Sequence, residues 1–254
     1  MKKLAIIIQA RMGSTRLPNK VLAEIEGKPM LWHTINRLKF SKTSPDIIIA
    51  TTDAEKDKKI VELAKNLNLQ YFAGSIHDVL DRYYQTALHF NIEIIARITS
   101  DCPLIDPYVF DKVVKEFLNG NYDYICNTNP PTFPDGLDVE IFTFEALEKA
   151  WKEARLTSER EHVTAYIYKN PNLFQLGNVS NDIDYSYLRW TVDEKEDLKF
   201  VREIYKHLYQ QKKIFLMDDI LKLLKEKPRL MEINSKFSRN EGYIKSLQKD
   251  RIVK

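Results

Sequence analysis

The first hundred residues alternate between short apolar runs and longer segments in which apolar residues recur at helical spacing. Continuous apolar runs at residues 4–8 (LAIII), 47–52 (IIIATT) and 92–99 (IEIIARIT) are typical of strands buried on both faces, and residues 70–72 form a shorter candidate. Helical spacing is found across residues 28–38, 55–67 and 78–90. This alternation predicts an α/β fold with a mostly parallel sheet that is covered by helices on both faces.

The second half of the chain is less regular. Prolines at positions 130, 131 and 134 interrupt any helix there, and residues 138–142 (DVEIF) alternate like a half-exposed strand. We expect a strand at residues 187–192, a helix at 158–168 that opens with the capping-box pattern SERE, and an amphipathic helix at 194–210. The prediction is one domain over residues 1–254, with a small β-rich insertion at about 128–145 and a helical C-terminal segment at about 194–254.

Composition and charge narrow the class of protein. The 254 residues are 44% hydrophobic and 30% charged, which is typical of a folded globular chain. The 39 basic and 36 acidic residues leave a formal net charge of +3, so we expect no nucleic-acid partner. The apolar run at residues 4–10 is too short for a signal peptide, and no run reaches the roughly 20 apolar residues of a membrane span. We therefore expect a cytoplasmic protein that does not bind a membrane.

The densest candidate chemistry lies in the loop at residues 11–20 (RMGSTRLPNK), directly after the first predicted strand. Gly13 permits a tight turn whose backbone N–H groups can surround an anion, and Arg11, Arg16 and Lys20 add three positive charges. Binding of a triphosphate requires both backbone hydrogen-bond donors and positive charge within one loop. The loop matches neither the Walker pattern nor the spaced glycines of a dinucleotide-binding loop. Its alternative interpretation is an ordinary exposed basic loop.

Two aspartates stand at the ends of other predicted strands. Asp101 follows the run at 92–99, with Pro103 close behind it, and Asp193 follows the run at 187–192. Ligands of parallel sheets bind at the carboxyl ends of the strands, and Mg²⁺ takes one or two carboxylates together with substrate phosphates. If both aspartates converge, they form a metal site that faces the basic loop. The alternatives are structural, with Asp101 as a turn residue and Asp193 as the N-cap of the following helix.

The same loop resembles the signature of a known family. Residues 10–20 (ARMGSTRLPNK) are similar to those of the cytidylyltransferases that activate acidic sugars as CMP conjugates, such as the Kdo and sialic acid enzymes. The resemblance is closest to the spore-coat polysaccharide biosynthesis branch. Further matches follow in order over most of the chain, at residues 27–30, 50–53, 74, 78–82, 97–106, 135–140, 161–164 and 189–193. Where the family usually has glycine before the metal-binding aspartate, this chain has Ser100.

The resemblance implies a Rossmann-like nucleotidyltransferase fold, CTP as the nucleotide, Mg²⁺ as the cofactor, a sugar or sugar-acid acceptor and release of pyrophosphate. The expected catalytic residues are Arg11, Lys20 and Asp101, and the expected metal ligands are Asp101 and Asp193. The nucleotide-binding set comprises Ala10, Arg11, Gly13, Ser14, Arg16, Lys20, Asp78, Arg82, Arg97 and Ser100. The candidate acceptor contacts are Asp138, Glu140, His162 and Arg189. Because related enzymes are commonly dimers, a homodimer is also expected.

Two other functions compete with this interpretation. A glycosyltransferase that uses a nucleotide-sugar would usually carry an Asp-x-Asp metal motif after a central strand, whereas residues 100–103 read SDCP. A non-catalytic nucleotide-binding subunit would have no need for the basic loop and both strand-end aspartates together. Transfer of a sugar in the first case, or tight CTP binding without turnover in the second, would distinguish these functions from a nucleotidyltransferase.

Overall fold

A seven-stranded sheet forms the centre of the protein, in a computed structural model that describes residues 2–209 and 214–253. The strands lie in the order β5-β4-β1-β6-β8-β7-β9, and only β8 runs antiparallel to its neighbours. Their bounds are β1 Leu4–Gln9, β4 Asp46–Thr52, β5 Gln70–Gly74, β6 Ile94–Thr99, β7 Tyr124–Cys126, β8 Glu140–Thr143 and β9 Leu176–Asn178. The expected mostly parallel sheet is therefore confirmed.

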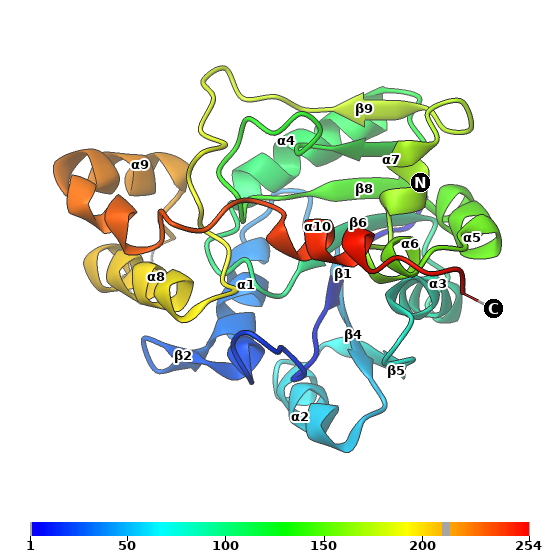
Figure 1. Cartoon of the computed structure of the whole chain (residues 1–254), viewed down its shortest axis with the longest axis horizontal. Coiled ribbons are helices and arrows are strands. Elements are labelled where there is room, and N and C mark those ends of the chain that lie inside the picture. The colour runs from blue at the N-terminus through cyan, green and yellow to red at the C-terminus, as the bar shows by residue number, and fades with distance from the viewer. Residues whose placement is uncertain (1, 210–213, 254) are drawn as a thin grey trace.

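Helices cover both faces of this sheet (Figure 1). One face packs against α1 (Met30–Leu38), α2 (Lys58–Asn66) and α4 (Pro107–Asn119), and the other against α3 (Val79–His89), α5 (Phe144–Glu153) and α7 (Ala165–Lys169). Within β1, Ile6 and Ile8 face the first set of helices, whereas Ala5 and Ile7 face the second. All four side chains are fully buried, which explains why the run has no polar alternation.

A third apolar cluster lies beside the sheet, around the buried indole of Trp190. It joins α8 (Lys195–Leu208), α9 (Met217–Glu226) and the 3-10 helix η3 (Pro228–Ile233) to the segment before Asp193. The chain then returns as α10 (Glu241–Gln248), which crosses in front of the ends of β1 and β6 next to the short helix α6 (Thr157–Glu161) (Figure 1). The smaller elements are η1 (Lys20–Leu22), η2 (Glu55–Asp57) and the ribbon of β2 (Glu24–Ile25) and β3 (Lys28–Pro29).

Most of the elements expected in the first half are confirmed, with ends that differ by a few residues. The expected helix at 158–168 is wrong as one unit, because the chain breaks into α6 and α7 where Val163 adopts a φ of 56°. The expected strand at 187–192 is also wrong: this segment makes one isolated bridge, between Asp135 and Arg189. Residue 210, the expected end of the last amphipathic helix, lies outside the described residues.

The segment at 128–145 differs from the expected β-rich insertion. Its strand, β8, is an inner strand of the central sheet, and Ile141 and Phe142 of β8 pack into the clusters on opposite faces. Residues 128–139 are irregular apart from isolated bridges. Among the described helices, none has the length and apolar character needed to cross a membrane.

Candidate active site

The adjacent parallel strands β1 and β6 bring together the two segments that carry most of the predicted site residues. In the register of β1 with β6, Ile8 pairs with Ile98 and Gln9 with Thr99. The basic loop at 11–20 and the turn at 100–106 therefore leave the sheet side by side at the carboxyl ends of adjacent strands. This edge is where ligands of parallel sheets bind.

Contacts from a neighbouring element hold the basic loop in shape. The backbone N–H of Met12 donates to Asp57 Oδ1 at 2.7 Å, and the buried Asp57 carboxylate also accepts a hydrogen bond from Thr52. Ser14 Oγ accepts from the N–H of Leu17 at 3.3 Å, and Asn19 adopts a left-handed conformation with a φ of 60° before η1 begins. The sharp turn at Asn19 places Lys20 at the start of η1, facing Asp101.

Lys20 joins the two strand-end aspartates. Its Nζ donates to Asp101 Oδ2 and to Asp193 Oδ1 at 2.8 Å each, and to the carbonyl oxygen of Val192 at 2.9 Å. Asp193 is close to Asp101 because the N–H of Val192 donates to the carbonyl oxygen of Asp101 at 2.9 Å. The expected convergence of the two carboxylates is thus present in the structure, across 92 residues of sequence.

Lys20, Asp101 and Asp193 form a triad in which opposite charges stabilise one another. Burial opposes the charged form of Lys20, but the carboxylates of Asp101 and Asp193 outweigh it and raise the pKa of Lys20 above its usual value. Burial likewise opposes ionisation of Asp101, but the Lys20 charge and hydrogen bond lower the pKa of Asp101 to about 2. Lys20 and Asp101 are therefore both charged at neutral pH.

Asp193 is not the N-cap of the following helix. Glu194 occupies that position, and Asp197 Oδ2 accepts the N–H groups of Asp193 and Glu194 at 2.9 Å each. The carboxylate of Asp193 is instead directed to cations: Arg16 Nη2 lies 2.8 Å from its Oδ1, and Arg189 Nη2 lies 3.3 Å from its Oδ2. The helix is capped by a different acid, which leaves the Asp193 carboxylate for the site.

A cavity of about 610 Å³ opens beside this triad. Twelve of the expected site residues line it: Ala10, Arg11, Gly13, Ser14, Arg16, Lys20, Arg82, Arg97, Ser100, Asp101, His162 and Asp193. Among all its lining residues, seven carry positive charges and three carry carboxylates, namely Asp101, Glu161 and Asp193. A cavity with this excess of positive charge suits a polyanion such as a nucleoside triphosphate.

Contacts with neighbouring residues hold two of the arginines that line the cavity, Arg97 and Arg82. Arg97 of β6 is paired with Glu140 of β8, and Glu140 Oε1 also accepts hydrogen bonds from the hydroxyls of Tyr124 (2.7 Å) and Thr164. Burial opposes the charge on Arg97, but Glu140 outweighs it and raises the pKa of Arg97. Arg82 donates to the carbonyl oxygen of Ser75 at 2.6 Å, while its buried Nε has no partner among the described residues.

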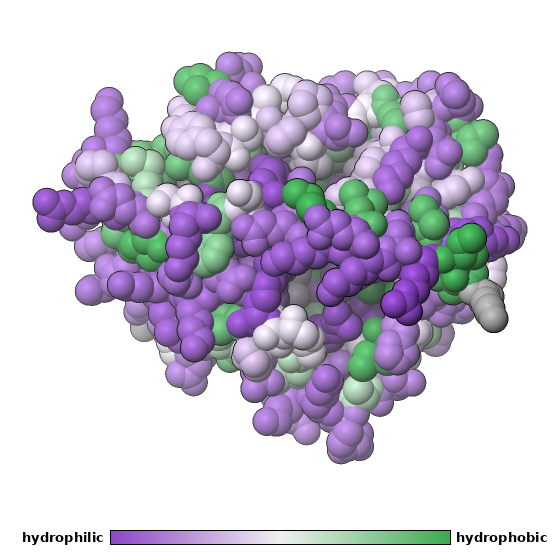
Figure 2. Space-filling view, in the orientation of Figure 1, coloured by the Kyte–Doolittle hydropathy of each residue, from purple (hydrophilic) through white to green (hydrophobic). Residues whose placement is uncertain are grey.

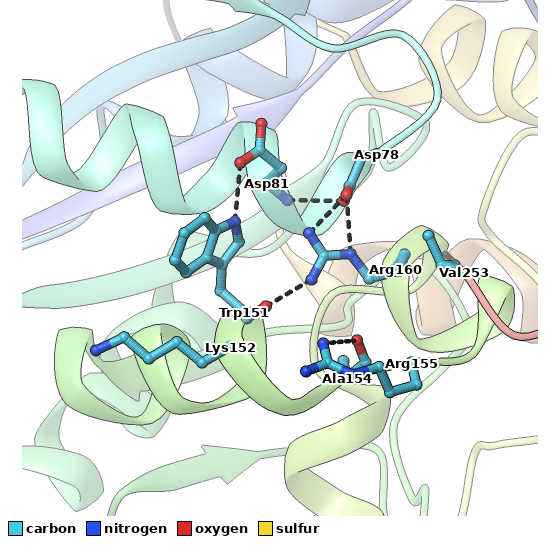
Figure 3. Close-up of a pocket in the computed structure, with 8 residues that line it drawn as sticks. All are labelled: Asp78, Asp81, Trp151, Lys152, Ala154, Arg155, Arg160 and Val253. Atoms are coloured by element: carbon cyan, nitrogen blue, oxygen red, sulfur yellow. Dashed lines mark hydrogen bonds and ion pairs between the residues drawn. The ribbon is translucent and has the colours of Figure 1, made fainter.

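Four expected site residues do not line the cavity, because their carboxylate or guanidinium groups are used elsewhere. Glu140 holds Arg97, Asp138 Oδ1 accepts from Arg239 at 2.6 Å, and Arg189 bridges Asp135, Asp193 and Asp197. Asp78 caps α3 through the N–H of Asp81 and accepts two hydrogen bonds from Arg160. Figure 3 shows Asp78 and Arg160 facing each other in a separate cavity of about 500 Å³, with Trp151 beside them. Asp78, Asp138, Glu140 and Arg189 thus contact other side chains in this structure and do not reach the cavity beside Lys20.

A family model described as cytidylyltransferase matches residues 5–239, a span that contains the triad and the basic loop. This chain belongs to the cytidylyltransferase family. The spore coat polysaccharide biosynthesis protein SpsF of Bacillus subtilis is 30% identical over 217 residues, which cover 81% of this chain and 87% of SpsF. A 3-deoxy-manno-octulosonate cytidylyltransferase of Lawsonia intracellularis is 35% identical over 118 residues, which cover 44% of this chain and 45% of that protein.

A solved structure supports the same assignment. The structure of a cytidylyltransferase from Leptospira borgpetersenii matches this cytidylyltransferase with a TM-score of 0.88 and 35% sequence identity, over 94% of this chain and 100% of that chain. The expected Rossmann-like nucleotidyltransferase fold is confirmed by this match together with the mostly parallel sheet.

The donor set of this cytidylyltransferase fits a magnesium ion. Asp101 and Asp193 direct one oxygen each to a common point, which is marked by the Lys20 ammonium group at 2.8 Å from both. Across residues 2–209 and 214–253, no group of three or more His, Cys, Asp or Glu side chains could hold a metal alone. Two carboxylates without further protein ligands suit Mg²⁺, which completes its coordination with waters and substrate phosphates.

Sequence reasoning missed one whole wall of the cavity. Glu161 was expected to complete a capping box, but Glu159 does so, by accepting the N–H groups of Arg155 and Leu156 at 3.0 Å each. Glu161 lines the cavity instead, and α10 adds Gly242, Lys245 and Ser246, with Lys249 at the C-cap of the helix. No local signal identifies the α10 residues, because they lie more than 220 positions from the basic loop that they face.

Proposed function

We propose that this cytidylyltransferase transfers CMP from CTP to an acidic sugar, with Mg²⁺ as cofactor and release of pyrophosphate, for the synthesis of a surface polysaccharide. The observation that carries the proposal is the meeting of Lys20, Asp101 and Asp193 in a cavity that Arg11 and Arg16 also line. The choice of CTP rests on family membership. The acidic sugar and the polysaccharide rest on the names of the two relatives.

In the proposed reaction, an acceptor hydroxyl oxygen forms a bond to the α-phosphorus of CTP while the bond from that phosphorus to the β-phosphate oxygen breaks. The hydroxyl proton passes to solvent, and pyrophosphate leaves. Bound Mg²⁺ would neutralise charge on the phosphates and lower the pKa of the acceptor hydroxyl. The protein contributes positioning and charge, so no covalent intermediate is required.

Each residue of the triad has a defined part. Asp101 and Asp193 would hold the metal ion, which requires Lys20 to exchange its two carboxylate partners for phosphate oxygens. Arg11, Arg16 and Lys20, with Ser14 and the backbone at Ala10 and Gly13, would bind the triphosphate. Arg82, with its unpartnered Nε, and Arg97 and Ser100 would bind the nucleoside, and His162 would lie near the acceptor.

The residues outside the cavity have positioning roles in this proposal. Arg189 orients Asp193, Glu140 orients Arg97, Asp78 fixes the start of α3, and Asp138 fixes the chain before α10 through Arg239. A cytoplasmic location and a homodimer, both expected from the sequence, belong to the proposal as well. A glycosyltransferase is disfavoured because the family is one of nucleotidyltransferases.

The proposal is tested by pyrophosphate release from CTP, GTP and ATP with Mg²⁺ and a pool of sugar acids. We expect release from CTP, and a loss of at least about a thousandfold in Asp101→Ala, because that variant lacks half of the metal site. The Asp218→Ala variant is the matched control, since it removes an exposed carboxylate of α9 that lies outside the cavity. Release from GTP or ATP but never from CTP would contradict the choice of nucleotide, and full activity of Asp101→Ala would contradict the metal site.

A further inference from the structure

Helix α10 forms the wall of the cavity opposite the sheet. Gly242, Lys245, Ser246 and Lys249 line the cavity, and their spacing of i, i+3, i+4 and i+7 places them on one face of the helix. Ile244 and Leu247 lie on the other face and are exposed. Figure 2 shows a hydrophilic band across the middle of this side of the molecule, where Figure 1 places α10. The helix therefore presents its polar face to the site.

Contacts at both ends fix α10 in this position. Before the helix, Arg239 binds Asp138, and the carbonyl oxygen of Ser238 accepts from Arg189 at 3.1 Å. After it, Asp250 accepts from the N–H of Ser158 at 2.9 Å and from the hydroxyl of Thr157 at 3.0 Å. In the middle, Ser246 donates to Glu161 at 2.8 Å. No residue of α10 is fully buried, and these polar contacts hold the helix over the cavity together with the edge-to-face packing of Tyr243 on His162.

The two lysines on the face of α10 that lines the cavity, Lys245 and Lys249, have few ionic contacts within the protein. Lys249 has no carboxylate within 4.0 Å among the described residues, and Lys245 has only Glu241, at 3.8 Å. The carboxylates that line the cavity are likewise engaged elsewhere: Lys20 binds Asp101 and Asp193, and Ser246 binds Glu161. Lys249 therefore gives this wall a positive charge with no carboxylate partner among the described residues, and Lys245 adds a second charge whose ion pair with Glu241 is long, at 3.8 Å.

The lysines lie apart from the triphosphate loop. Gly242 marks the near end of the helix, since a β-carbon there would lie 3.8 Å from Arg16 Nη2. With a rise of about 1.5 Å per residue, Lys249 lies about 10 Å further along the axis. The family match ends at residue 239, so α10 also lies beyond the part that supplies Arg11, Arg16, Lys20 and the aspartates. The family match covers the nucleotide site but not this cationic wall. We therefore assign a different anion to each of them.

We propose that Lys245 and Lys249 of α10 bind the carboxylate of the acceptor sugar and so determine the specificity of this enzyme for acidic over neutral sugars. The proposal rests on the proposed function, because it assigns the acceptor to the remaining space of the same cavity. Two ammonium groups one helical turn apart suit one carboxylate, and each charge-assisted contact adds to the affinity.

The test compares Lys245→Met/Lys249→Met with Lys222→Met/Lys225→Met, two exposed lysines of α9 that lie away from the cavity. Dissociation constants are measured by NMR titration for 3-deoxy-manno-octulosonate, N-acetylneuraminate and glucuronate, and for the neutral sugars mannose, N-acetylmannosamine and glucose, all without nucleotide. We expect the wild-type and control proteins to bind at least one acid in preference to its neutral counterpart. In the α10 variant we expect the affinity for that acid to fall by at least about tenfold.

CTP with Mg²⁺ is titrated separately into the same proteins. We expect its dissociation constant to change by less than about twofold in the α10 variant. The proposal is overturned if no acid binds the wild type, if the variant binds the acid as tightly, or if CTP affinity falls as much as acid affinity, which would assign the lysines to the triphosphate. Failure of CTP to bind the wild type would instead contradict the proposed function, because the acid titration does not depend on nucleotide.

Discussion

At the scale of single residues, the site depends on how Lys20 and Asp101 determine each other's charge. Lys20 neutralises two carboxylates that would otherwise repel each other at the edge of the sheet. The same ammonium group keeps the pKa of Asp101 at about 2, so this proposed metal ligand is ionised at every physiological pH. In the proposed reaction, both partners would keep their charge and change only their contacts when phosphate oxygens and a metal ion bind.

Replacing Lys20 by Met is expected to raise the pKa of Asp101 above its ordinary value of 3.8, because burial and the Asp193 charge remain while the cation is lost. In the wild type, the depressed pKa contributes stability above about pH 4, and this contribution is lost as the pH falls toward 2. The variant lacks it and should lose about 2 kcal/mol of unfolding free energy at pH 7. Carboxyl carbon NMR titration and urea unfolding measure the two effects.

Arg16→Met is the control for this comparison, since Arg16 contacts Asp193 and Glu194 but not Asp101. In that variant the pKa of Asp101 should stay near 2. An unchanged Asp101 pKa in Lys20→Met would show that the charge coupling of the triad is wrong.

The residues of the basic loop were predictable because glycine, hydroxyls and cations of one short segment act together, directly after a buried strand. The roles of Asp138, Glu140 and Arg189 were not, since a charged residue in a matched motif can bind either a ligand or another side chain. Their partners Arg239, Arg97 and Asp197 decide the matter, and two of these three ion pairs join residues more than 40 positions apart. Lys245 and Lys249 carry no signature at all, because an exposed lysine on a short helix is usually a solvated surface residue.

At the scale of elements, Asp193 depends on a close backbone contact that only glycine allows. Backbone hydrogen bonds join the segment 189–193 to Asp135 and to Asp101. Gly136 directly follows Asp135 in the chain. Gly136 has a φ of 108°, and a β-carbon there would lie 2.6 Å from the backbone nitrogen of Thr191. The segment that carries Asp193, a proposed metal ligand, is thus packed directly on this glycine.

Gly136→Ala should therefore cost at least about 3 kcal/mol of unfolding free energy and displace Asp193, which lowers turnover. Gly27→Ala is the matched control: Gly27 has a φ of 70°, but nothing lies within 4 Å of an added β-carbon, so the cost should be about 1 kcal/mol and turnover should be unchanged. Urea unfolding curves and initial rates measure both. Equal costs for the two substitutions would contradict the close contact at Gly136.

The apolar pattern predicted burial more reliably than strand pairing. In the segment 187–192, Leu188, Trp190 and Val192 alternate and are buried as expected, yet the backbone bonds go to Asp135 and Asp101 instead of to a neighbouring strand. An alternating apolar pattern predicts which side chains are buried, but it does not predict the hydrogen-bond partners of the backbone. The break between α6 and α7 lies at Val163, whose backbone is left-handed and whose side chain is fully buried, so the apolar pattern again matches burial but not the course of the backbone.

At the scale of the whole molecule, three segments distant in sequence meet at one edge of the sheet. The first strand contributes the basic loop, the central strand β6 contributes Asp101, and the third apolar cluster holds the segment that ends in Asp193. The C-terminal helix α10 then covers the opposite side of the cavity. The sheet and its nucleotide edge follow from local patterns, whereas the covering wall depends on how the chain returns to the cavity between Asp193 and α10.

The central claim of this account is that CMP is transferred to an acidic sugar. The most direct measurement is mass spectrometry of the products formed from CTP, Mg²⁺ and a mixed pool of sugar acids, neutral sugars and sugar phosphates. The account predicts one new species with the mass of a sugar acid plus CMP less one water, together with pyrophosphate, and neither species with the Asp101→Ala variant. A product in which CMP is joined to a neutral sugar, or no CMP conjugate from any acid in the pool, would contradict it.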